Sequence, residues 1–178
     1  YENYYIYQLG LSYEKILEFY NKYKEEFEIL GFSDMNKWEL MKYTKLDSTI
    51  ADLAKQRDFT EPFILKDESK LKALEKIAFE YGIKITKGGR FYHLIGINQD
   101  KGRAVSETVK IFEKVFNTKT KTIALGDGQN DIAMLENVDV PIIIKNHKGG
   151  YINCKIKNIQ KSTYKGSTGW SEMVLKNV

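Results

Sequence analysis

The apolar positions of the first 95 residues follow helical spacing in some stretches and the alternation of strands in others. Helical spacing predicts four helices, over residues 12–27, 37–43, 47–55 and 69–81. Ser12 caps the first helix, either Asp47 or Ser48 caps the third, and residues 31–36 form a break. Gly82 follows the last helix at the position where glycine commonly ends one.

Extended segments are interspersed with these helices. Strand-forming residues recur over 3–9, 59–65, 83–87 and 90–95. Gly88 and Gly89 separate the last two segments, which is a strong signal for a β-hairpin. Pro62 has no backbone N–H and therefore favours an edge position for its strand. Residues 1–95 are thus predicted to form an α+β unit around an antiparallel sheet.

The pattern changes after Gly96, where helices and strands begin to alternate. The predicted elements are a helix over about 102–116, a strand over 122–125, a helix over about 132–137, a strand over 141–145 and a short terminal helix after 166–169. Such alternation is typical of βαβ units with a parallel sheet. We therefore expect an α/β fold with two domains, residues 1–95 and 96–178.

Composition limits what the protein can do. Its 178 residues are 42% hydrophobic, which is enough for folded cores, and no apolar run approaches the roughly 20 residues that span a bilayer. The net charge of +4 is dispersed, so we expect a small anionic partner and neither nucleic acid nor membrane. The single cysteine, Cys154, excludes an internal disulfide framework and fits a reducing, cytoplasmic location.

The densest group of chemically useful side chains is the loop Gly126–Asp131, which follows a short apolar run. Ligands bind at the carboxyl ends of strands in open α/β sheets, and Mg²⁺ prefers oxygen ligands such as the carboxylates of Asp127 and Asp131. An EF-hand is excluded, because Ile132 stands where its loop needs glycine and Val138 where it needs glutamate. A turn with an Asp or Asn helix cap remains the alternative to a metal site.

Lys101 begins the helix that leads toward this acidic loop. An ammonium group there offers a point charge to a phosphate that is held near carboxylates and a cation. A lysine at such a position is more often a solvated surface residue, and this alternative stays open for Lys101 considered alone. Its combination with the acidic loop makes it a candidate site residue.

The two segments together resemble motifs of phosphatases in the haloacid dehalogenase superfamily. The acidic loop is similar to the fourth motif of that family, and Asn98–Gly102 is similar to the third. The resemblance implies that Asp127 and Asp131 form the Mg²⁺ site and that Lys101 is the catalytic lysine, in contact with the phosphoryl group and the nucleophile. It also implies that Asn130 contacts the substrate.

Further segments resemble the mannosyl-3-phosphoglycerate phosphatases of this superfamily. Residues 54–63 and 87–93 are similar to their cap, and residues 166–170 are similar to a Gly-Pro-x-Gly-Trp region, with Ser167-Thr168 in place of the proline step. The resemblance implies a HAD-like fold in which an α+β cap of type C2B joins the C-terminal half of a Rossmann-like core. It implies a phosphorylated sugar substrate, bound from the cap by Arg57, Glu61, Gly88, Gly89 and Arg90.

The chemistry of these side chains agrees with that assignment but leaves alternatives. Arginine forms a bidentate fork with carboxylate or phosphate, and glutamate accepts hydrogen bonds from sugar hydroxyls. Arg57 could equally pair with a neighbouring carboxylate at the surface, and the two glycines at 88–89 could be only a hairpin turn. Tyr92 and His93 alternate along their strand, so one is expected to face a cleft and the other the core or solvent.

One part of the family's catalytic apparatus is missing from the sequence. The mechanism uses an Asp-x-Asp, whose first carboxylate forms an aspartyl-phosphate and whose second acts as general acid and base. This chain contains no Asp-x-Asp, and its opening residues align with the start of the family's cap. We therefore expect an inactive fragment of a Mg²⁺-dependent phosphatase for mannosyl-3-phosphoglycerate or a related glycosyl-phosphoglycerate.

Two alternatives to this function stay open. One is a phosphatase of the same superfamily that acts on another sugar phosphate. The other is a non-catalytic module that binds a sugar phosphate or a protein partner. An incomplete core would also expose a strand edge, which favours self-association.

Overall fold

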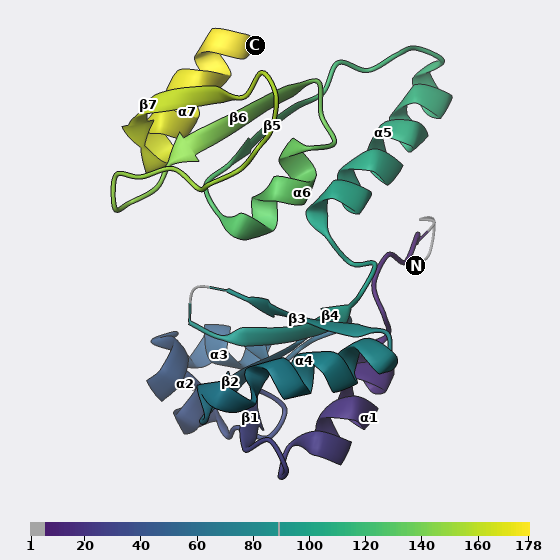
Figure 1. The fold of residues 1–178 in the computed structure, drawn as a ribbon, viewed down its shortest axis with the longest axis vertical. Helices are drawn as coiled ribbons and strands as arrows, with labels where there is room; N and C mark the ends of the chain where they lie inside the picture. The colour runs from purple at the N-terminus through teal and green to yellow at the C-terminus, as the bar shows by residue number, and fades with distance from the viewer. Residues whose placement is uncertain (1–5, 89) are drawn as a thin grey trace. The chain divides into compact units, whose positions relative to one another are not determined.

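The computed structural model describes residues 6–88 and 90–178. The chain divides into two compact units, residues 1–99 and residues 100–178, which are the purple-to-teal and the teal-to-yellow parts of Figure 1. The change in sequence pattern at Gly96 lies close to this division. Each unit has its own sheet and its own hydrophobic core, and each is described by itself below.

The first unit is built on an antiparallel sheet with the strand order β1-β2-β4-β3. Its strands are β1 (Ile29–Gly31), β2 (Glu61–Leu65), β3 (Ile83–Lys87) and β4 (Tyr92–Gly96). The predicted hairpin is confirmed, with Ile85 opposite Leu94 and Lys87 opposite Tyr92. The predicted α+β unit with an antiparallel sheet is therefore confirmed over the described residues.

Two helices pack on one face of this sheet and form the larger core. They are α1 (Tyr13–Tyr23) and α4 (Leu71–Glu80), the latter preceded by the single 3₁₀ turn η1 (Glu68–Lys70) (Figure 1). Phe63 and Leu94 of the sheet are fully buried beneath them, together with Ile16, Phe19, Tyr20 and Leu74 of the helices. Burial of large apolar side chains of this kind is the main favourable term in folding the unit.

A second, smaller cluster contains α2 (Lys37–Thr44) and α3 (Ser48–Ala54). Phe32, Met35, Leu40 and Ala51 are buried in it, and Leu30 and Ile64 of the sheet pack against it. Because neighbouring residues of a strand point to opposite faces, Leu30 and Ile64 lie on the face opposite Phe63. The sheet is therefore covered on both faces.

The helix predictions of this unit are confirmed, except at the two ends of α1. Ser12 is the N-cap residue of α1, but its side chain makes no capping hydrogen bond. Asp47 caps α3 by accepting from the backbone N–H groups of Thr49 and Ile50, both at 3.0 Å, and Gly82 has a left-handed φ of 72° after α4. The first helix was predicted to reach Phe27 but ends at Tyr23. Glu28 has a φ of 51° and redirects the chain toward β1, while Phe27 stays buried in the turn.

The strand predictions contain three errors. The segment Ile29–Gly31, which lies between the predicted first helix and the predicted break at 31–36 and includes its first residue, is the strand β1, whose apolar run is too short to show a period. Residues 6–9 form no strand, and residues 3–5 of the predicted segment lie outside the described residues. Pro62 lies in β2, between β1 and β4 and not at a sheet edge.

The position of Pro62 has a local explanation. Its carbonyl accepts from the Phe32 N–H at 2.9 Å, and the N–H and C=O of one strand residue point the same way. The missing N–H of Pro62 therefore faces the turn beyond Gly31, where β1 has already ended. A proline is tolerated inside the sheet because this stretch of β2 is locally an edge.

The second unit contains the parallel sheet that the alternating pattern predicts. Its strand order is β5-β6-β7, with β5 (Ile123–Gly126), β6 (Val140–Lys145) and β7 (Gln160–Lys165). Its helical segments are α5 (Lys101–Phe116), the 3₁₀ turn η2 (Gln129–Asp131), α6 (Ile132–Leu135) and α7 (Gly166–Asn177). Within the described ranges, no helix is long and apolar enough to cross a membrane.

The strand β7 was not predicted, because its sequence lacks an apolar run. Ser162 is its buried residue, 1% exposed, and the Ser162 hydroxyl accepts from the Lys145 N–H at 2.9 Å and donates to the Tyr164 carbonyl at 2.8 Å. This strand is therefore defined by its pairing with β6 and by the packing of α7, and not by a hydrophobic pattern in its sequence.

Candidate functional site

The loop after β5 is folded around the carboxylate of Asp131. Asp131 is 6% exposed, and its Oδ2 accepts from the backbone N–H groups of Asp127 and Gly128, both at 3.0 Å. A Cβ on Gly126 would lie 2.4 Å from the Asp131 Cβ, so a side chain at position 126 cannot coexist with this arrangement. The glycine and the second aspartate of the predicted motif thus have a structural reason to occur together.

Lys101, the first residue of α5, reaches the same carboxylate. Its Nζ donates to Asp131 Oδ1 at 2.5 Å, while the Lys101 side chain remains 51% exposed. The start of α5 is fixed by Asp100, whose side chain accepts from the Arg103 N–H at 2.8 Å. The structure therefore brings together the lysine and the acidic loop, which the sequence separates by a helix.

The environment of Asp131 keeps its carboxyl group ionised. Burial acts to raise the pKa of Asp131, but the hydrogen bonds from Lys101 and from the backbone of Gly128 and Asp127 outweigh it. The pKa of Asp131 therefore lies below its ordinary value. The bond to Asp131 in turn holds the Lys101 ammonium group beside the loop.

A cavity of about 360 Å³ opens beside this loop. Its lining includes Lys101, Asp127 and Asp131, together with Ser167 and Trp170 at the start of α7. The segment 166–170 was noticed in the sequence only for its resemblance to other chains. That Ser167 and Trp170 line this cavity could not be predicted, because it depends on how α7 packs.

The two predicted metal aspartates differ in their availability. Asp127 is exposed, and no hydrogen bond to its carboxylate is found in residues 6–88 and 90–178, whereas both oxygens of Asp131 already accept from neighbours. The described part of the chain contains no cluster of three or more His, Cys, Asp or Glu side chains. The donor set fits a cation held by Asp127, with further oxygens from water and a phosphate, while Asp131 supports the loop.

Asn130 lies on the same loop and is exposed. It is not among the residues that line the cavity. Its side-chain oxygen would lie 2.6 Å from a Cβ on Gly128, which places it against the loop backbone. Asn130 thus lies on the loop backbone, outside the lining of the cavity.

A second cavity, of about 190 Å³, lies within the first unit and is called the arginine pocket here. Its lining includes Phe32, Arg57, Arg90, Phe91 and His93. The Arg57 Nε donates to the Ala54 carbonyl at 2.7 Å, and its guanidinium lies 5.8 Å from the centre of the Phe32 ring. The structure therefore brings the two predicted substrate arginines together, although the sequence separates them widely.

Arg90 is tied to the end of α2. Its Nη2 donates to the Thr44 carbonyl at 2.5 Å, and its Nη1 donates to the Tyr43 carbonyl at 3.4 Å. These bonds hold the guanidinium at the wall of the pocket. Carboxylate and phosphate groups are the ligands that two fixed guanidinium groups recognise best.

His93 is the member of the Tyr92–His93 pair that faces the arginine pocket. Tyr92 lies on the other face of the strand, stacked on Phe63 at 5.7 Å between ring centres. Burial, and secondarily the charge of Arg57, lowers the pKa of His93, so its imidazole is neutral at pH 7. A Cβ on Gly88 would lie 2.9 Å from His93 Nε2, and Gly89 lies outside the described residues.

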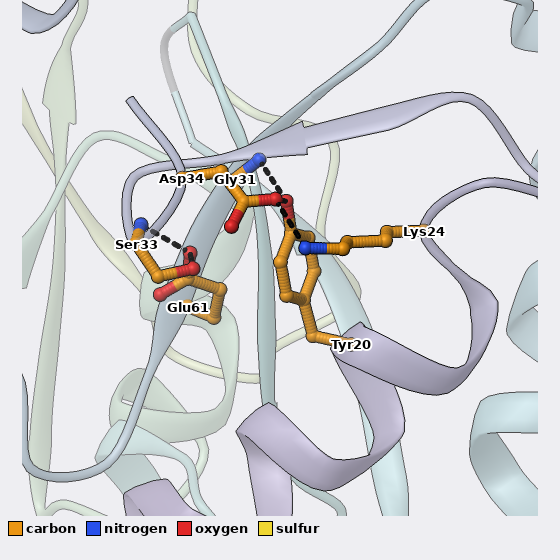
Figure 2. Close-up of polar contacts among 6 residues, drawn as sticks. All are labelled: Tyr20, Lys24, Gly31, Ser33, Asp34 and Glu61. Atoms are coloured by element: carbon orange, nitrogen blue, oxygen red, sulfur yellow. Dashed lines mark hydrogen bonds and ion pairs between the residues drawn. The ribbon is translucent and has the colours of Figure 1, made fainter. Parts of the chain in front are cut away.

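Glu61 lies on the opposite face of the sheet from the arginine pocket. Its side chain is 0% exposed, and it accepts from the Tyr13 hydroxyl at 2.5 Å. It also accepts from the Ser33 N–H and hydroxyl at 2.8 and 2.7 Å (Figure 2). Burial and the bond to Glu61 raise the pKa of Tyr13, which therefore stays a donor. Among the described residues no hydrogen bond or ion pair joins Arg57 and Glu61, although the charge of Arg57 acts on Tyr13, which donates to Glu61.

The sequence matches the family described as haloacid dehalogenase-like hydrolase over residues 1–154. It is 49% identical over 171 residues to a glucosyl-3-phosphoglycerate/mannosyl-3-phosphoglycerate phosphatase of Persephonella marina. It is 36% identical to a protein of the same name from Methanococcoides burtonii and 30% identical to a mannosyl-3-phosphoglycerate phosphatase of Pyrococcus furiosus. These matches cover 96%, 97% and 89% of this chain, but only 64% of each relative.

Solved structures with low sequence identity share the fold. The protein 0175 of Thermoplasma acidophilum superposes with a TM-score of 0.62 at 14% identity, covering 93% of this chain and 62% of that one. BT1666 of Bacteroides thetaiotaomicron, described among phosphatases of the haloalkanoate (HAD) superfamily, gives 0.58 at 13% identity, with 96% and 66% coverage. At such identities the likeness concerns the fold alone.

Proposed function

Because the chain belongs to the family of haloacid dehalogenase-like hydrolases, we propose that it is part of a phosphatase that acts on a glucosyl- or mannosyl-3-phosphoglycerate. The named phosphatases at 49% and 36% identity support the substrate class. The chain spans 64% of their length, so the proposed activity belongs to a protein that contains this chain together with further residues. A glycosyl-phosphoglycerate is also the small anionic partner that the composition favours.

The observation that carries the proposal is the group formed by Lys101, Asp131 and Asp127 at the carboxyl end of β5. The Lys101 ammonium group, held by Asp131, would contact the phosphoryl oxygens and balance their charge. Asp127 presents a free carboxylate to the same cavity and would hold Mg²⁺. When bound, Mg²⁺ polarises a phosphoryl oxygen and neutralises charge that develops there.

The first unit would act as the cap that binds the rest of the substrate. Arg57 and Arg90 would hold the carboxylate of the glycerate, since their guanidinium groups line one pocket. Gly88, which has no side chain, would let its backbone approach the same group. In this proposal residues 1–95 are the C2B-type cap and residues 96–178 the C-terminal part of the core.

The nucleophile would come from outside these 178 residues, because the sequence contains no Asp-x-Asp. An aspartyl-phosphate and a general acid are the parts of the family's mechanism that the present residues do not supply. The single free cysteine, Cys154, fits the reducing cytoplasm in which we place the enzyme.

The proposal is tested by measuring phosphate release from glucosyl-3-phosphoglycerate and mannosyl-3-phosphoglycerate. A protein that joins this chain to the Asp-x-Asp region of a relative should release phosphate with Mg²⁺ and stop when EDTA removes it. Lys101→Ala and Asp127→Asn should each lower the rate by at least about 100-fold, a loss typical of removing a charged group that stabilises a transition state.

The chain alone is the matched control and should show no turnover. Turnover by the chain alone would contradict the missing nucleophile. An intact protein that hydrolyses neither glycosyl-phosphoglycerate, but does hydrolyse other sugar phosphates, would contradict the substrate class.

A further inference from the structure

The turn after β1, residues 31–35, connects the two faces of the sheet in the first unit. Its Ser33 reaches Glu61 on the face covered by α1, and its Phe32 lies in the arginine pocket on the other. Adjacent residues of this turn therefore contact two groups that the sheet keeps apart. The bonds that hold the turn on the α1 face therefore also fix the position of Phe32 on the opposite face.

Buried polar bonds hold the turn on the α1 face (Figure 2). The Gly31 N–H donates to the Tyr20 hydroxyl at 2.7 Å, and that hydroxyl donates to Asp34 at 2.9 Å. Lys24 donates to the same Asp34 oxygen at 2.7 Å. Glu61 of β2 joins this network through the N–H and the hydroxyl of Ser33, and the Phe32 N–H adds a backbone bond to the Pro62 carbonyl of the same strand.

The packing around this turn is tight. A Cβ on Gly31 would lie 2.3 Å from Glu61 Oε1 and 2.7 Å from Tyr20 Cζ. The turn can therefore sit against Glu61 only because a glycine stands at position 31. Because Gly31 packs directly against the Glu61 carboxylate and the Tyr20 ring, the turn has little room to move.

On the other face, Phe32 supports the guanidinium of Arg57. Phe32 is 3% exposed, its N–H donates to the Pro62 carbonyl at 2.9 Å, and its ring meets Phe91 edge-on at 5.0 Å between centres. The Arg57 guanidinium lies 5.8 Å from the centre of this ring, within the range of a cation–π contact. The position of Phe32 thus limits the positions open to Arg57.

We propose that Glu61 is a positioning residue of the arginine pocket: it holds Ser33, and through Ser33 it holds the Phe32 ring on which Arg57 rests. The proposal deepens the proposed function, and it rests on that function in so far as Arg57 binds the substrate. A direct contact between Glu61 and a sugar hydroxyl is the alternative. Glu61 is 0% exposed and already accepts three hydrogen bonds, whereas a carboxylate has about four acceptor sites.

The first test needs no ligand. The Nε–H signal of Arg57 is followed by ¹⁵N NMR in the 178-residue chain, and the Arg57→Lys variant assigns it by its loss. In Glu61→Ala the signal should shift or broaden, because Ser33 loses its acceptor and Phe32 is released. Glu61→Gln should restore the signal, since the amide oxygen can still accept from Ser33.

Two further variants keep this test decisive. Ser33→Ala removes one of the two Ser33 bonds and should shift the Arg57 signal in the same direction, even if Glu61→Ala fails to fold. Ile83→Val removes one methylene from the same core, in β3, and should lower the melting temperature without moving the signal. An Arg57 signal that stays in place in Ser33→Ala and in folded Glu61→Ala would overturn the proposal.

The second test separates positioning from direct contact by calorimetric binding of two probes, 3-phosphoglycerate and glucosyl-3-phosphoglycerate. If Glu61 positions the pocket, Glu61→Ala should weaken the binding of both probes about tenfold. The double variant Arg57→Ala/Glu61→Ala should then bind each probe no more weakly than Arg57→Ala alone. A loss confined to the glucosylated probe would show direct sugar contact and overturn the proposal. If Arg57→Ala binds both probes as tightly as the unmodified chain, the cap assignment fails, and the NMR comparison alone decides the role of Glu61.

Discussion

At the scale of single residues, Asp131 joins three parts of the second unit through one carboxylate. Its oxygens accept from Lys101 on α5 and from the backbone of Asp127 and Gly128 in the loop. These bonds favour the ionised form, so the pKa of Asp131 in the folded protein lies below its ordinary value. A group with a lowered pKa stabilises the fold above its unfolded pKa, and this contribution is lost as pH falls through the folded pKa.

We therefore expect Asp131→Asn to destabilise the second unit at pH 7 by about 2 kcal/mol, because an amide cannot accept from all three donors. In the unmodified protein this contribution should be complete above about pH 5 and decline below the ordinary carboxyl pKa of about 3.9. Urea unfolding between pH 7 and pH 3 measures both effects.

Asp127→Asn is the matched control for this prediction. Asp127 is exposed, and within the described residues its carboxylate has no hydrogen bond, so its replacement should leave the unfolding free energy within about 0.5 kcal/mol of the unmodified value. Equal pH dependence in Asp131→Asn and in the unmodified chain would contradict the role given to Asp131.

At the scale of elements, Gly102 allows α5 to pack against α6. A Cβ at position 102 would lie 2.3 Å from the Ala133 carbonyl oxygen, which belongs to the backbone and cannot rotate away. Lys101 precedes this contact directly, so the approach of the two helices sets where its ammonium group meets Asp131. A glycine in the first turn of a helix, usually unfavourable, is here required by packing.

Gly102→Ala should therefore destabilise the second unit by about 1–3 kcal/mol, the usual cost of overpacking, even though alanine favours helix. It should also weaken the Lys101–Asp131 bond, which is detected as a rise in the pKa of Asp131 by NMR titration. Thr108→Ala, on the exposed side of the same helix, should leave that pKa unchanged. A stabilised Gly102→Ala variant would show that the two helices are not in contact.

The elements also show how far sequence patterns reach. The hairpin of β3 and β4 was predicted because alternation and a glycine pair agree locally. The strand β7 was not predicted because its sequence has no hydrophobic pattern: it is held by pairing with β6, and its buried residue is Ser162. Pro62 was assigned to an edge because proline lacks an N–H. The strand β2 is an inner strand, and the early end of β1 that lets it accommodate the proline has no signal in the sequence near Pro62.

At the scale of the whole molecule, the two units have separate cores. The first core surrounds Phe63 and Leu74, and the second contains Ile142, Ile144 and Met173. The two tryptophans divide between them, with Trp38 in the first unit and Trp170 in the second. Both side chains are largely exposed, 78% for Trp38 and 52% for Trp170, so their fluorescence reports little of unfolding, and backbone amide hydrogen exchange distinguishes the two units instead.

We expect the units to unfold in separate transitions. Leu74→Ala should destabilise the first unit by about 2–5 kcal/mol, the cost of a cavity in a buried core. Hydrogen exchange of the amides of β2 and β4 should then become faster, whereas exchange of the amides of β5 and β6 should not change. A common change in both sets of amides would mean that the chain unfolds as one cooperative body.

The sequence by itself determined the alternation of elements, the family and the acidic loop after β5, because these depend on short-range periodicity and on motifs continuous in the chain. The family match and the solved structures of similar fold confirm the HAD-like fold. Only the tertiary structure decided that Arg57, Arg90 and His93 share a pocket and that Glu61 lies on the opposite face, among Tyr13 and Ser33. The reason is physical: side-chain neighbours distant in sequence are set by strand order and by the alternation of faces, and a one-residue change in register would exchange them.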